Sequence, residues 1–229
     1  MKINILFIAT IALFIALIVR GYKKGFLRIA VTFVGMIVII IAAKRITPYL
    51  SDFIINNTKT YDKIENKINE RFAEANRQYD NTVAENQVLT INSYELPDVI
   101  KTSLIDNNTE SVYQSLLVNV FEDYVSAYLA KGAVKALSFV LMFAVVFIAF
   151  KIVLKVVDII SKIPIIKGLN KYAGAILGFI ESLFIVWVVF FLILVFIGNS
   201  SGSSFLKMIS ENGFLSFLFN NNLLMGAVY

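Results

Sequence analysis

The chain has 229 residues, of which 58% are hydrophobic, 14% are aromatic and only 16% are charged. Soluble domains carry about 25% charged residues and less apolar content, so this composition is typical of a membrane protein. The sequence contains no histidine and no cysteine, which excludes disulfides, thiolate or imidazole catalysis and the usual zinc sites. We therefore expect no cofactor and no metal. The net charge of +5 is interpreted as setting the orientation in the lipid bilayer, and nucleic-acid binding is not expected.

Four long apolar runs predict transmembrane helices, because a helix needs about 20 apolar residues to cross the hydrocarbon core. They are Ile3–Val19, Phe26–Ala43, Ala133–Phe150 and Tyr172–Ile197. A secretory signal peptide is the alternative for the first run. No small-residue cleavage site follows that run and its basic residues lie on the wrong flank, so we interpret it as a retained span.

The order of apolar and polar stretches predicts an all-α integral membrane protein with four transmembrane helices. An extracytoplasmic helical segment is expected between the second and third helices, and an amphipathic tail after the fourth. The predicted parts are a first helical hairpin (1–43), the outer segment (44–132), a second helical hairpin (133–198) and the tail (199–229).

Basic residues in two short loops predict the orientation in the membrane. The first loop contributes four cations and no acid: Arg20, Lys23, Lys24 and Arg28. The second contributes five, against Asp158 alone: Lys151, Lys155, Lys162, Lys167 and Lys171. Both loops are therefore expected in the cytoplasm, which places both termini and the outer segment outside. The outer segment has 13 acidic residues against nine basic ones, in agreement, although Lys2, Lys44, Arg45 and Lys131 argue the other way.

The outer segment has the pattern of amphipathic helices. One apolar stripe recurs at steps of four and three: Ile64, Ile68, Phe72, Ala75 and Tyr79. Pro97 is placed at the start of a short helix, and a later helix beginning near Thr109 or Ser111 is expected to run on into the third span. These helices either cover the mouth of the bundle or dock another protein.

The tail combines a polar stretch with large apolar side chains. Asn199–Ser204 is expected to be a flexible linker, and Asn220–Asn222 argue against a fifth span. The apolar residues are Phe205, Leu206, Ile209, Phe214, Leu215, Phe217, Leu218, Phe219, Leu223 and Leu224. They are expected either to lie in the outer membrane interface or to pack on the outer helices.

Small residues spaced by four predict close helix packing in the fourth span. Gly174, Gly178 and Ser182 share one helix face, which serves either packing against another span of the same chain or homo-oligomerisation. Gly21 and Gly25 have the same spacing, but basic residues surround them. We therefore expect this second pair to form the turn between the first two spans.

Glu181 is a carboxyl inside a predicted span, on or beside this glycine face. An ionisable group at membrane depth usually meets a partner or water and often marks a function. Lys135 is the nearest basic residue in another span, but it is expected on the opposite face, so pairing is not predicted. A position near the membrane interface is the alternative for Glu181. The sequence contains no phosphate-binding loop, paired carboxylates or serine–base arrangement, so we do not expect an enzyme.

The segment Arg20–Arg28, which closes one apolar run and opens the next, resembles the signature of the colicin V production protein (CvpA) family. Pro48, Ile163–Asn170 and Gly174–Gly178 fit the family pattern in order and spacing, as do Phe121–Val125 and the asparagine-rich tail. The resemblance implies a bacterial inner-membrane protein with about four spans, associated with colicin V production or export. At the position of Glu181 many members of that family have a basic residue instead.

Two functions are consistent with these patterns. The first is a non-enzymatic multi-pass membrane protein that assists toxin production or export and envelope homeostasis through contacts with another envelope or export protein. The alternative is a small oligomeric channel or transporter that uses Glu181 and the face formed by Gly174, Gly178 and Ser182.

Overall fold

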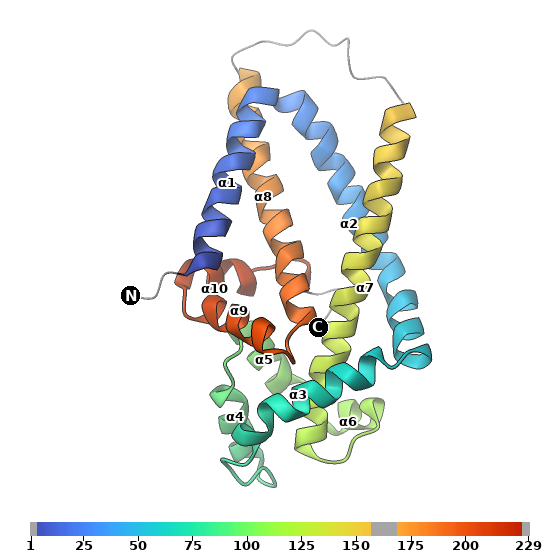
Figure 1. Ribbon diagram of the computed structural model, residues 1–229, viewed down its shortest axis with the longest axis vertical. Helices are drawn as coiled ribbons and strands as arrows, with labels where there is room; N and C mark the ends of the chain where they lie inside the picture. Colours follow the sequence, from blue (N-terminus) through green and yellow to red (C-terminus); the bar gives the residue numbers. More distant parts are fainter. Residues whose placement is uncertain (1–3, 157–168, 226–229) are drawn as a thin grey trace. The chain divides into compact units, whose positions relative to one another are not determined.

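The computed structural model describes residues 4–156 and 169–225, apart from the side chains of residues 27–29, 31–32, 153–156 and 169. Every regular element in this part of the chain is an α-helix (Figure 1). The helices are α1 (Ile5–Lys24), α2 (Phe26–Asn57), α3 (Thr60–Asn76), α4 (Ala84–Ser93), α5 (Asp98–Asp106), α6 (Glu110–Leu116), α7 (Phe121–Val156), α8 (Leu169–Val195), α9 (Ser200–Ser210) and α10 (Gly213–Asn220). The predicted all-α class is confirmed for the described residues.

Four of these helices contain apolar stretches long enough to cross a membrane. The stretches are Ile5–Lys24, Phe33–Asn57, Phe121–Ile152 and Asn170–Val195. The shortest has 20 residues and is about 30 Å long at 1.5 Å per residue, which equals the thickness of the hydrocarbon core. The prediction of four helices able to span a membrane is therefore confirmed.

The helix that carries the second span is longer than the apolar pattern predicts. It continues past Ala43 as far as Asn57, and Pro48 lies inside it. Proline leaves the carbonyl four residues earlier without its helical donor. Next to it, the Thr47 hydroxyl donates to the carbonyl of Ala43 (Oγ1–O 2.7 Å). The charged residues Lys44 and Arg45 end the apolar run but not the helix, because lysine and arginine are good helix formers.

A break at Leu117 separates α6 from α7, where the sequence predicts one continuous helix. Leu117 has a φ of 59° and lies in the left-handed region. Its amide donates to the carbonyl of Gln114 (N–O 3.2 Å), and the amide of Val118 donates to that of Tyr113 (N–O 3.1 Å). These bonds satisfy the last carbonyls of α6 and end the helix.

The chain forms two compact units that interleave in sequence. Unit 1 consists of residues 1–48 and 138–189, and unit 2 of residues 49–137 and 190–229. Within their described residues, unit 1 contains α1 with parts of α2, α7 and α8. Unit 2 contains α3–α6, α9 and α10 with the remaining parts of the three long helices. The four-part division of the chain stays a prediction.

The tail packs on the outer helices within unit 2. The Asn220 side chain accepts a hydrogen bond from the amide of Val99 at the start of α5 (N–Oδ1 3.3 Å). On the end of α8, the ring of Phe219 packs against that of Phe190 in a tilted arrangement, at 5.2 Å between ring centroids, and both side chains are fully buried. The stripe on α3 faces inward too, because Ile68 and Phe72 are buried. The tail therefore packs on the outer helices, which is the second of its two expected placements.

The polar stretch at the start of the tail is helical, which corrects the prediction of a flexible linker. Asn199 is the N-cap residue of α9, and Ser200–Ser204 form its first turn and a half. The Ser203 hydroxyl accepts a hydrogen bond from Nε of Arg71 in α3 (3.0 Å). A Cβ atom on Gly202 would lie 1.8 Å from the carbonyl oxygen of Phe196. Tertiary contacts therefore order a stretch whose composition is typical of linkers.

Candidate functional site

Helices α1 and α8 touch through their backbones at three glycines within unit 1. A Cβ atom on Gly21 would lie 2.2 Å from the carbonyl oxygen of Gly174, and one on Gly174 would lie 2.4 Å from that of Gly21. One turn away, a Cβ atom on Gly178 would lie 2.4 Å from the carbonyl oxygen of Leu17. Side chains cannot fit at such distances, so these glycines allow the two helices to approach closely. The glycine face of α8 is thus covered by α1 of the same chain.

The remaining small residues of the predicted site have different roles. Ser182 is fully buried and its hydroxyl returns to its own helix, donating to the carbonyl of Phe179 (2.5 Å). Gly25 forms the turn between α1 and α2 with a φ of 78°, and a Cβ atom there would lie 2.3 Å from Nδ2 of Asn170. Gly21, predicted to belong to this turn, lies inside α1 instead, because its backbone continues the helix against Gly174.

The glycine contact brings Arg20 and Glu181 together. Arg20 precedes Gly21, and Glu181 lies three residues after Gly178. The Nη2 atom of Arg20 donates to both carboxylate oxygens of Glu181, at 3.0 and 3.2 Å. Glu181 is 5% exposed, so its negative charge is compensated where little water reaches it.

This pair is not predicted from the sequence, where Arg20 indicates only orientation and Lys135 is the basic residue considered as a partner for the carboxylate. The signal was the shared four-residue spacing of the two glycine pairs. Aligning Gly21 with Gly174 in antiparallel helices places Arg20 within reach of Glu181.

A cavity of about 530 Å³ adjoins this ion pair, and we call it the unit 1 cavity. It is lined by Arg20, Lys24, Met36, Ile39, Phe143, Phe147, Phe150, Lys151, Glu181 and Ile185. Three cations and one carboxylate meet six apolar side chains in it. The Nζ atom of Lys151 lies 5.1 Å from the centre of the Phe147 ring, a cation–π contact. The cavity can therefore hold a molecule with an anionic group and an apolar part.

The other cations used to predict the orientation lie elsewhere. Lys23 is exposed, and Nζ of Lys171 lies 5.7 Å from the centre of the Tyr22 ring. Lys162 and Lys167 lie outside the described residues, as does most of the Ile163–Asn170 stretch, and the side chains of Arg28 and Lys155 are likewise not described.

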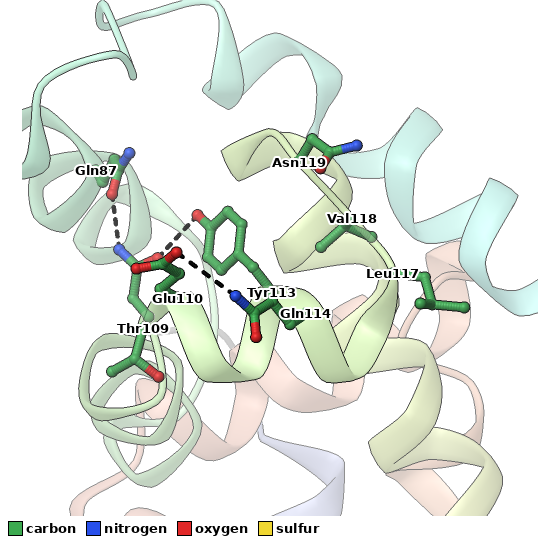
Figure 2. Close-up of a pocket in the computed structure, with 9 residues that line it drawn as sticks. Gln87, Thr109, Glu110, Tyr113, Gln114, Leu117, Val118 and Asn119 are labelled. Carbon is green, nitrogen blue, oxygen red and sulfur yellow. Dashed lines mark hydrogen bonds between the residues drawn. The ribbon is translucent and has the colours of Figure 1, made fainter.

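A polar hollow of about 820 Å³ lies on unit 2 (Figure 2). It is lined by Gln87, Asn108, Thr109, Glu110, Tyr113, Gln114, Leu117, Val118 and Asn119. Asn108 donates to Gln87 (Nδ2–Oε1 2.7 Å) and accepts from the Tyr113 hydroxyl (2.9 Å). Burial and the charge of Glu122 raise the pKa of Tyr113 to about 12, so its hydroxyl keeps its proton at neutral pH.

Leu117 at the rim of this hollow, which we call the Tyr113 hollow, is 91% exposed. A leucine side chain offers apolar area and no reactive group. No group of histidine, cysteine, aspartate or glutamate side chains that could hold a metal ion occurs among the described residues. The hollow is not predicted from the sequence, because α4 and α6 bring its polar residues together only in the folded unit.

Taken together, helices long and apolar enough to cross a membrane and a buried carboxylate paired with an arginine of a second such helix define a helical membrane protein. The family model of the colicin V production protein matches residues 111–220, from α6 to the last residue of α10. This match confirms the resemblance seen in the sequence, and the segment Arg20–Arg28 precedes the matched residues. Comparisons with curated proteins and with solved structures find no match.

Proposed function

We propose that this chain is a non-enzymatic, multi-pass protein of a bacterial plasma membrane that assists production or export of a peptide toxin and supports envelope homeostasis. The observation that carries the proposal is the colicin V production family match over residues 111–220. That match includes two of the four helices able to cross a membrane. Such a role needs no enzyme chemistry, since contacts with other envelope components suffice.

The proposed orientation places both termini and α3–α6 outside the cytoplasm. Its support is the positive charge beside the α1–α2 turn, where Arg20, Lys23 and Lys24 lie within five residues of Gly25. Lys151 and Lys171 have the same position relative to the second loop. Short cytoplasmic loops carry an excess of basic residues.

The proposed contact surface for another envelope or export protein is the Tyr113 hollow with its exposed rim. Leu117 and Val120 are 91% and 51% exposed, although both are large and apolar. Apolar side chains that stand beside polar, hydrogen-bonding groups are typical of surfaces that bind proteins. Both residues belong to unit 2, whose outer helices would face the envelope in the proposed orientation.

Photocrosslinking in cells tests this role. Photoreactive residues at Leu117 and Val120 should capture one specific envelope or export protein, identified by mass spectrometry. Leu223 in the tail, 76% exposed, is the matched control position. Capture of the same set of proteins from all three positions, or of copies of the chain alone, would contradict the proposal.

A second candidate function is that of a small channel or transporter. The observation that favours it is the Arg20–Glu181 pair in the wall of the unit 1 cavity, because charged pairs at membrane depth commonly mark paths for ions or solutes. Reconstituted vesicles test it: Glu181→Gln should abolish or alter cation or proton flux in a transporter. An accessory protein should keep its cellular phenotype in this variant.

A further inference from the structure

The cations of the unit 1 cavity exceed what Glu181 can neutralise. Arg20 is bound to the carboxylate through Nη2. Lys24 and Lys151 are exposed, and neither takes part in an ion pair among the described residues. The cavity wall therefore carries excess positive charge, which favours an anionic ligand.

Arg20, which lines the cavity, also has a hydrogen-bond donor that the described residues leave unused. Nε of Arg20 is buried and has no hydrogen-bond partner among the described residues. Buried polar groups are nearly always satisfied, and an unpaired one calls for an acceptor. An oxyanion oxygen would satisfy a guanidinium N–H with a charge-assisted bond, while Glu181 keeps the guanidinium in place.

The apolar side of the cavity indicates the rest of the ligand. Phe143, Phe147 and Phe150 follow one another at steps of four and three on α7, so they share one helix face. Met36 and Ile39 of α2 lie in the same lining. A small hydrated anion would leave this wall uncovered, whereas an acyl chain would cover it at a gain proportional to the apolar area buried.

The position of the cations fits a lipid headgroup. Lys24 is the last residue of α1, and Lys151 lies next to the last residue of the apolar stretch Phe121–Ile152. Lysines at the ends of spans extend to the level of the headgroups, and each contributes attraction to anionic lipid. Arg20 lies one turn before Lys24 on α1, further inside the apolar stretch Ile5–Lys24.

We propose that the unit 1 cavity binds an anionic membrane lipid, with the phosphate of its headgroup between Arg20, Lys24 and Lys151. An acyl chain of this lipid lies against the phenylalanines of α7. The cavity volume of about 530 Å³ is that of a small-molecule site, so the cavity holds the headgroup and the first part of one acyl chain. Lipid binding here is independent of whether unit 2 docks another protein.

The test uses the purified full chain in neutral detergent and measures bound lipid by native mass spectrometry and the unfolding temperature. The ligands are phosphatidylglycerol, phosphatidylcholine with the same acyl chains, and inorganic phosphate. Phosphatidylglycerol should remain bound and raise the unfolding temperature in proportion to its occupancy. Phosphatidylcholine should do neither, because its headgroup is neutral overall.

Matched variants separate the cavity from general surface charge. Lys24→Gln and Lys151→Gln should each weaken phosphatidylglycerol binding roughly fivefold, the effect expected for one lysine at an anionic headgroup. Lys23→Gln removes the same charge from the neighbouring exposed residue, which does not line the cavity, and should keep the affinity. Ile185→Trp should reduce binding by filling the cavity while all charges remain.

Each result decides the proposal. Selective binding of phosphatidylglycerol that depends on Lys24 and Lys151 supports it. If inorganic phosphate gives the same stabilisation with the same lysine dependence, the phosphate site stands and its ligand is a soluble phosphate, which overturns the lipid. Equal binding of both lipids, or an equal loss in Lys23→Gln, would overturn the site itself.

Discussion

Arg20 binds the Glu181 carboxylate with a single nitrogen, since Nη2 lies 3.0 and 3.2 Å from its two oxygens. The two residues are 161 positions apart in sequence, and the carboxylate side chain is 7% exposed against 37% for the arginine. A carboxylate so far removed from water needs a compensating charge. The charge of Glu181 is therefore compensated only when α8 packs against α1.

Removing one charge of this pair should destabilise the protein more than removing both. Arg20→Gln leaves the buried carboxylate without a counter-charge, and we expect the free energy of unfolding to fall by about 3 kcal/mol. The double variant Arg20→Gln, Glu181→Gln has neutral amides instead and should recover at least half of that loss. Thermal unfolding in one detergent is measured for the unmodified chain, for Arg20→Gln and Glu181→Gln alone, and for the double variant. Purely additive losses would contradict the coupling.

The contact between α1 and α8 should not tolerate a single added methyl group. Gly174→Ala places a Cβ atom 2.4 Å from the carbonyl oxygen of Gly21, so the helices must separate. We expect a loss of about 1–3 kcal/mol in the free energy of unfolding. Gly213→Ala is the matched control, because a Cβ atom there meets no other atom within 4 Å. Equal stability of the two variants in thermal unfolding would show that the close contact is absent.

The sequence predicts the helices of this protein better than their pairings. Length and hydropathy are enough for the four spans, because both requirements are local. The partner of Glu181 depends on how α1 aligns with α8, which only the matched spacing of Gly21 and Gly174 indicates. The spacing indicates the Arg20–Glu181 pair only if Gly21 is assigned to the contact with α8. Assigning Gly21 to the turn gives no partner for Glu181.

Two local structures could not be predicted, because tertiary contacts overrule the local preference. The left-handed conformation that Leu117 adopts at the end of α6 is unfavourable for a leucine. The serine- and glycine-rich start of α9 favours a linker, but Gly202 lies against Phe196 and Ser203 bonds to Arg71. The hydrogen bonds of the Tyr113 hollow could not be predicted either, since they join residues far apart in sequence, such as Gln87 of α4 and Asn108 between α5 and α6.

The docking of the tail should depend on Phe219 and not on its neighbour Phe217. Phe219 is fully buried against Phe190, so Phe219→Ala should cost about 3–5 kcal/mol of unfolding free energy. Phe217 is 62% exposed, and Phe217→Ala removes the same ring from the same helix with little expected loss. Limited proteolysis should release the tail faster in the first variant only. Equal release from both would contradict the packing of α10 in unit 2.

Stability should depend on pH through Glu65, which lies on α3 outside the spans. Burial raises the pKa of Glu65 above its ordinary value of 4.5, although a hydrogen bond from Tyr61 partly opposes this shift. The folded state therefore holds the proton more tightly than the unfolded state. Its stability falls as the pH rises from the ordinary pKa of 4.5 through the raised pKa of the folded state. Glu65→Gln removes this loss and should be more stable at neutral pH, by less than about 1 kcal/mol because solvent screens the group.

The difference between Glu65→Gln and the unmodified chain should vanish at low pH, where the carboxyl is protonated in both states. Thermal unfolding from pH 4 to 8 measures this difference. Glu70→Gln, on the exposed side of the same helix, is the control for the loss of one carboxylate. The same pH dependence in both variants would refute the role assigned to burial of Glu65.

Leu117 allows stability and partner binding to be separated. Its left-handed backbone conformation is unfavourable for leucine but suits glycine. Leu117→Gly should therefore leave the free energy of unfolding unchanged or raise it by about 1 kcal/mol. The same variant removes the most exposed apolar side chain at the Tyr113 hollow. Crosslinking from Val120 to the partner should therefore fall although the protein is as stable as before. Undiminished crosslinking in Leu117→Gly would remove Leu117 from the contact surface, and Leu117→Asn, which also tolerates this conformation, provides a second test.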